Sequence, residues 1–294
     1  MKFHAQLSSP ILAVLLLLQT AEAITIQTNF RDSGQTLGTF GTAGGAPSSA
    51  VGGGNLQLLV EAAADYWESA FADPFVLTID YGWFPRASSA ATHRLASEGG
   101  SPHRETAATI AFDNDSVLWF LDLSPLDNVE FSTFTAYLND LGGGLMNTGR
   151  EYTGGSGSAA RFDLLTTAIH EVGHALGLSN ANNAFQETAR DSLINISGNL
   201  PFSGAAIPIV SGEAHLNLAH ALLRPSRPSG VRRFASEADI LSNAQISQFS
   251  QVNLTPVIPE PAVSCLLSLT LLLGGLRASW SACRANKRIP RLAS

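Results

Sequence analysis

The segment TTAIHEVGHALGLSN, residues 166–180, constrains the fold of this chain more than any other stretch. Its apolar residues recur at helical spacing over so much of the surface that they predict a helix buried on most sides. Asp163 is placed to cap the start of this helix, and Gly177 is a natural stop at its end. Buried polar side chains are costly unless they find partners, so His170, Glu171 and His174 point to a shared site.

The spacing of these polar residues matches the geometry of a zinc site. Positions four apart differ by about 40° around a helix, so His170 and His174 lie on one face and can reach a single ion. Zinc lowers the pKa of water to about 7, and the adjacent Glu171 can then take the proton as a general base. The alternative is a helix whose histidines simply face solvent.

The sequence leaves the third zinc ligand open. Catalytic zinc sites normally have three protein ligands and one open position. The longer pattern HExxHxxGxxH would place a histidine at position 180, but this chain has Asn180, whose neutral amide is a poor zinc ligand. The remaining sources are Glu187, which forms an ExxxD pair with Asp191, and the two histidines His215 and His220. A site with no third ligand also remains open.

Composition narrows the class of protein. The formal net charge of −7 and a charged content of only 14% argue against nucleic-acid binding, which needs clustered lysine and arginine. A hydrophobic content of 45% is ample for a packed core. Both cysteines, Cys265 and Cys283, lie near the C-terminus, so a metal ion in the main part of the chain must be held by histidine or carboxylate.

The two ends differ in character from the rest of the chain. Residues 1–23 contain Lys2, an apolar run and a small-residue site ending at Ala23, which together predict a secretory signal peptide. Residues 259–294 begin with Pro-Glu-Pro, continue with an apolar stretch over 262–276 and end in a basic cluster. That stretch is short for a full membrane span of about 20 residues, but it can anchor a chain transiently, with the basic cluster on the cytoplasmic side.

Between these ends, periodicity predicts an order of elements. We expect strands at 24–30, 75–84, 106–113 and 116–122, an amphipathic helix from Leu56 with Asn55 as its cap, and a closing amphipathic helix over 237–249 with Ser236 as its cap. Residues 85–105 and the glycine-rich 141–160 are expected to be loops, and 126–138 a short helix or turn.

The C-terminal order of PEP motif, apolar stretch and basic cluster resembles the PEP-CTERM sorting tail of Gram-negative bacteria. This resemblance implies export across the inner membrane, transient membrane association, cleavage by an exosortase-type transpeptidase, and a final place in the envelope, at the cell surface or in the extracellular matrix. The alternative is an ordinary C-terminal membrane anchor.

Four segments, together with this tail, resemble bacterial PEP-CTERM-tailed zincin-like zinc metalloproteases: TIAFDNDSVLWFLDLSPLDNVEF, DLLTTAIHEVGHALGLS, EAHLNLAHALLRP and SEADILSNAQISQFSQVNL. The resemblance implies an α+β fold in which a mixed twisted sheet packs on the HExxH helix, with a smaller C-terminal helical and loop part. The domain would span 24–250, followed by a linker over 251–258. By likeness to leishmanolysin-like zincins, His215 would be the third ligand and ALLRP, with Leu223, the apolar turn beneath the metal. Extended substrate would pair with an edge strand formed by TIAFD or SVLWFLD.

The resulting expectation is an exported zinc-dependent endopeptidase that cleaves peptide or protein substrates. Its metal ligands would be His170, His174 and His215, its cofactor Zn²⁺ and its general base Glu171. Tyr152 and His220 are candidates for stabilising the oxyanion. The alternatives are a non-catalytic envelope or matrix protein with a degenerate metal site and, with less support, a zinc amidase.

Overall fold

The computed structural model describes residues 23–87, 89–155 and 158–258. Within these ranges the chain combines β-sheets with four α-helices, so the expected α+β class is confirmed. Most of the expected signal peptide (1–22) and the expected PEP-CTERM tail (259–294) lie outside the described residues. No helix in the described ranges is both long enough and apolar enough to cross a membrane.

The larger sheet has four strands in the order β1-β4-β6-β5. These are β1 (Ile24–Phe30), β4 (Phe75–Trp83), β6 (Arg104–Phe112) and β5 (Ala91–Gly99). β1, β4 and β6 run parallel, whereas β5 runs antiparallel to β6 and forms one edge of the sheet. The apolar alternation in the sequence predicted β1, β4 and β6 because each of them buries side chains against the core.

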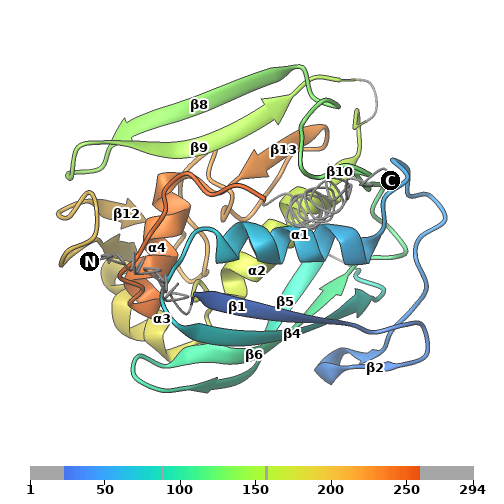
Figure 1. The fold of residues 1–294 in the computed structure, drawn as a ribbon, viewed down its shortest axis with the longest axis horizontal. Helices are drawn as coiled ribbons and strands as arrows, with labels where there is room; N and C mark the ends of the chain where they lie inside the picture. Colours follow the sequence, from blue (N-terminus) through green and yellow to red (C-terminus); the bar gives the residue numbers. More distant parts are fainter. Residues whose placement is uncertain (1–22, 88, 156–157, 259–294) are drawn as a thin grey trace, which may run out of the picture.

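Two helices cover one face of this sheet: α1 (Leu56–Glu68) and α2 (Leu164–Ala175). Figure 1 shows them between the four-stranded sheet and a second, smaller sheet. They pack directly on each other, and the indole Nε1 of Trp67 in α1 donates a hydrogen bond of 2.8 Å to the carbonyl of Ile169 in α2. Asn55 caps α1 by accepting from the backbone N–H of Leu58, as the sequence predicted.

The smaller sheet has the order β13-β9-β8 and lies on the other side of the helices (Figure 1). It comprises β8 (Thr133–Asp140), β9 (Leu145–Thr153) and β13 (Val231–Phe234), which leads into α4 (Glu237–Ser247). Ser236 caps α4 in a reciprocal capping box with Asp239. The helix and its cap were predicted, but an amphipathic α4 was wrong, because the helix is buried over nearly its whole length.

Short elements complete the fold. They are β2 (Thr36–Leu37), β3 (Gly41–Thr42), β7 (Trp119–Phe120), β10 (Phe162–Asp163), α3 (Asn183–Thr188), β11 (Leu193–Asn195), β12 (Ala206–Pro208) and two 3₁₀ turns at Gly38–Phe40 and Arg190–Ser192. β2 pairs with β3, β7 with β10 and β11 with β12. After α4, residues 251–258 pack back along the end of α1, where the N–H of Asn253 donates to the carbonyl of Ala70.

Three local predictions were wrong. Residues 85–105, expected as a loop, contain the edge strand β5, whose pairing with β6 shifts register near Leu95 and so breaks the alternation. Residues 126–138 and 141–160 contribute the β8–β9 hairpin, and the glycines at 142–144 form its turn. β8 is exposed along most of its length, although Phe134, Ala136 and Leu138 stand at alternate positions in it.

The expected edge strands also need correction. TIAFD, residues 109–113, lies mostly in β6, which is flanked by β4 and β5 and has no free edge. Within SVLWFLD, residues 116–122, only β7 is a strand, and its two residues pair with β10. β5 is therefore the edge strand next to α2.

Candidate active site

Helix α2 begins and ends where the sequence indicated. The Asp163 side chain accepts a hydrogen bond of 3.1 Å from the N–H of Thr166, and the chain turns away at Gly177, whose φ of 147° favours glycine. Arg232, fully buried, binds both carboxylate oxygens of Asp163 at 2.9 and 3.0 Å and so fixes the cap. Every residue of α2 is buried, so its two histidines and its glutamate are held in an apolar environment.

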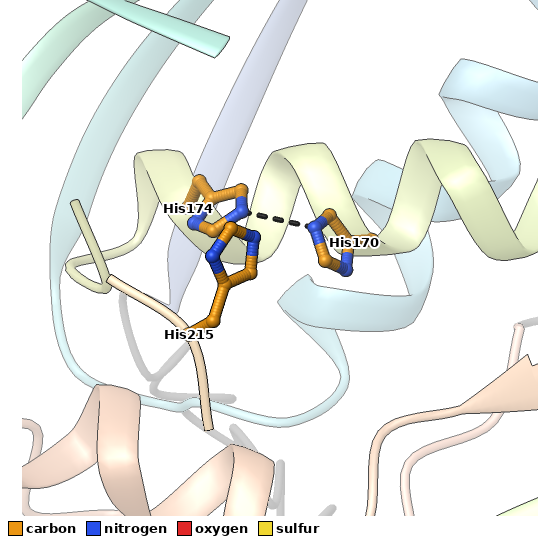
Figure 2. Close-up of side chains that lie close together, drawn as sticks. All are labelled: His170, His174 and His215. Atoms are coloured by element: carbon orange, nitrogen blue, oxygen red, sulfur yellow. Dashed lines mark hydrogen bonds between the residues drawn. The ribbon is translucent and has the colours of Figure 1, made fainter. Parts of the chain in front are cut away.

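The rings of His170 and His174 are each oriented by a backbone carbonyl. His170 Nδ1 lies 2.8 Å from the oxygen of Leu222, and His174 Nδ1 lies 2.5 Å from the oxygen of Leu178. A carbonyl oxygen only accepts hydrogen bonds, so both Nδ1 atoms carry the proton. Both Nε2 atoms are then unprotonated in the neutral rings, and they lie 2.9 Å apart (Figure 2).

Two facing lone pairs at this distance repel each other unless a positive species lies between or beside them. A second proton on one ring would serve, but burial lowers the pKa of both His170 and His174 well below the usual imidazole value. The arrangement therefore fits a metal cation better than an additional proton.

His215 joins these two rings from a distant part of the chain. Its ring centre lies 4.9 Å from that of His174 and 5.5 Å from that of His170, and ligand nitrogens of all three lie within 4.8 Å of one another (Figure 2). His215 Nδ1 is 3.3 Å from a carboxylate oxygen of Glu213, which favours metal binding through the other nitrogen. In the described part of the chain, this is the one cluster of histidine, cysteine or acidic groups that could hold a metal ion.

The structure places the alternative third ligands elsewhere. His220 stacks on Tyr137 with ring centres 3.5 Å apart, and its Nδ1 lies 3.1 Å from Glu151. Glu187 is exposed on α3, and Asp191 lies in the following 3₁₀ turn; neither belongs to the cluster. Asn180 is exposed, and its amide donates to the carbonyl of Gly212 in the loop that leads to His215.

A turn at residues 221–225 supports α2 from below. Leu223 is fully buried and faces Gly173, where an added Cβ would lie 2.7 Å from a Leu223 methyl carbon. The turn is held by Asp239, whose carboxylate accepts from the N–H groups of Leu222 and Leu223. Leucine thus provides apolar packing here, and the same turn presents the carbonyl that orients His170.

Glu171 lines a cleft of about 880 Å³ together with the three histidines. Burial raises the pKa of Glu171, and the charge of Arg227 and the neighbouring His93 oppose that rise. Residues Ala91–His93 of β5 form part of the cleft wall, so the edge strand runs beside the histidine cluster.

Sequence reasoning missed two residues of this cleft. His93, on β5, lies 2.7 Å from buried Glu105 on β6, and its ring stacks near that of His174 with centres 6.1 Å apart. Arg227 follows the supporting turn. The first was missed because β5 was expected to be a loop, and the second because no local pattern marks the segment that bears it.

The two oxyanion candidates named from the sequence do not line this cleft. Tyr152 lines a separate hollow of about 130 Å³, and His220 is occupied by Tyr137 and Glu151. Comparison of the chain with models of known protein families, with curated proteins and with solved structures finds no match.

Proposed function

We propose that this protein is a zinc-dependent endopeptidase with a zincin-like fold. The observation that carries the proposal is the set of three imidazoles from His170, His174 and His215, of which two have their protons fixed on the side away from the shared centre. Three neutral nitrogen donors, with further positions open to a cleft, are the ligand set of a catalytic zinc site.

When bound, zinc acts as a Lewis acid that makes water more acidic and polarises a carbonyl group. The chain's own residues supply the remaining steps. The carboxylate of Glu171, one residue from a ligand and facing the cleft, accepts a proton from the attacking water. It then passes that proton to the nitrogen of the departing amine. The apolar surroundings of α2 raise the pKa of Glu171 and so increase its affinity for the proton.

Strand β5 supports a peptide as the substrate. Within the described residues, its backbone pairs only with β6, so its other edge is available to an extended chain. The strand enters the cleft at Ala91–His93, beside Glu171, so a peptide added along this edge would run past the histidine cluster. The mixed sheet, the antiparallel edge strand and the supporting turn also favour the zincin-like fold.

Export, exosortase processing and a place in the envelope or matrix are part of the same proposal. They rest on the sequences of the two ends, residues 1–23 and 259–294, and on their resemblance to a signal peptide and a PEP-CTERM tail.

Elemental analysis and a peptidase assay test the proposal. Purified wild-type protein should bind one zinc ion, His215→Ala should lose it, and the matched control Glu187→Ala should retain it. Glu171→Gln should keep zinc and lose peptide cleavage by roughly 10²- to 10⁴-fold, the contribution of a positioned general base. Zinc-loaded wild type that cleaves neither casein nor a peptide library would instead support the non-catalytic alternative.

A further inference from the structure

Arg227 is an arginine in the cleft with no partner in the described part of the chain. Its guanidinium makes no hydrogen bond or ion pair to any described residue, and its Nε is shielded from solvent without an acceptor. Its neighbours in sequence differ: Arg224 donates to the carbonyl of Ala219, Arg232 binds Asp163 and Arg233 binds Glu151. The charge of Glu171 offsets only part of the cost of burying Arg227, whose pKa stays below its usual value, so Arg227 can accept a further anion from outside the chain.

The position of Arg227 indicates where that anion would lie. Arg227 lines the cleft together with Glu171 and the three histidines. An anion bound by Arg227 therefore lies in the cleft that holds the proposed metal site. In the proposed reaction the scissile bond lies in the same cleft, so the anion would come from a residue near that bond.

We propose that Arg227 binds a substrate carboxylate next to the scissile bond and so gives the enzyme a preference for aspartate or glutamate there. The inference rests on the proposed peptidase function. The planar guanidinium matches a carboxylate through two parallel hydrogen bonds, which an amide of the same shape cannot reproduce. Besides Glu171, the carboxylate of Glu213 also lines the cleft, but it lies against His215 and so does not compete with the substrate for Arg227.

A different role for Arg227 would be to act only through its charge on Glu171. In that case Arg227→Gln would slow the cleavage of all peptides by the same factor and shift the pH profile, without changing which residue lies beside the cut. The two roles are therefore separated by the ratio of rates for an acidic substrate and its amide counterpart.

The experiment compares a blocked alanine-based peptide that contains one aspartate with the same peptide that contains asparagine. Wild type should cut next to the aspartate, as read by mass spectrometry, with kcat/KM roughly 10- to 100-fold above the asparagine peptide. Arg227→Gln should bring that ratio close to one, and Arg227→Lys should restore part of it. Arg190→Gln, which changes an exposed arginine bonded only to the carbonyl of Glu187, should keep the wild-type ratio.

Binding provides a second measurement that needs no turnover. Fluorescence anisotropy of the two labelled peptides should show tighter binding of the aspartate form to zinc-loaded Glu171→Gln, and the difference should vanish in Glu171→Gln with Arg227→Gln. Equal binding of both peptides, or a rate ratio unchanged in Arg227→Gln, would overturn the proposal. If wild type cuts neither peptide but binds the aspartate form more tightly through Arg227, the peptidase function fails and the carboxylate site stands.

Discussion

The close approach of Gly173 to Leu223 gives a prediction whose size follows from the structure. In Gly173→Ala the new Cβ would lie 2.7 Å from one Leu223 methyl carbon and 3.0 Å from a ring carbon of Trp67. Ordinary carbon contacts are about 3.5–4.0 Å, so both neighbours must move by roughly 0.5–1 Å. Both are fully buried, and Trp67 is tied to the carbonyl of Ile169, so neither can move freely.

Two effects of opposite sign then decide the stability. Alanine is favoured over glycine in a helix by about 1 kcal/mol, whereas overpacking a buried contact costs about 1–3 kcal/mol. We expect Gly173→Ala to lower the free energy of unfolding of the metal-free protein by up to about 2 kcal/mol. Zinc affinity should also fall by about tenfold or more, because the displaced turn carries the Leu222 carbonyl that orients His170.

A double-mutant cycle in urea isolates the contact. Leu223→Ala alone should lower the free energy of unfolding by about 2–5 kcal/mol. In the double variant the new methyl group at position 173 fits the space that the leucine side chain leaves. The interaction energy between the two substitutions should therefore reach at least about 1 kcal/mol. Gly45→Ala, where an added Cβ meets no atom within 4 Å, should be neutral or stabilising by about 0.4–1 kcal/mol. A stabilised Gly173→Ala, or a coupling below about 0.5 kcal/mol, would refute the close packing of α2 on the turn.

Three further predictions concern the rest of the molecule. Arg232→Met should lower the free energy of unfolding by about 3–5 kcal/mol because it leaves buried Asp163 without its cation. Arg31→Met, which removes a half-exposed ion pair, should lower it by at most about 1 kcal/mol. Equal losses for the two variants in chemical unfolding would contradict this prediction. Burial alone would raise the pKa of Asp73, but hydrogen bonds from Gln251 and Ser250 hold it below the usual value. Asp73 thus contributes stability that is full above about pH 3.8 and is lost as pH falls through its folded pKa, so the difference between wild type and Asp73→Asn should shrink in acid. Finally, zinc at 100 times its dissociation constant should stabilise the fold by about 2.7 kcal/mol, and a chelator should remove that gain in a thermal scan.

Much of the helical framework could be predicted from local sequence. Asn55, Asp163 and Ser236 each cap a helix where the sequence placed one, because a cap depends only on residues three or four positions away. The HExxH spacing likewise puts two imidazoles on one face of α2 whatever the rest of the chain does. Strands that bury side chains, such as β4, also carried a readable alternation.

Only the tertiary structure decided the remaining parts of the site. His215 comes from an irregular segment far from α2 in sequence, and packing of the residues around it, not any local period, brings it to the other two rings. The edge strand β5 was hidden because its outer surface is polar and its register shifts near Leu95. Arg227 shows the same limit: the sequence records a cation, but whether it faces solvent, a carboxylate or an open cleft depends on long-range packing. Local hydrogen bonds and periodicity are encoded within a few residues, whereas the convergence of distant side chains follows from the burial of the whole core.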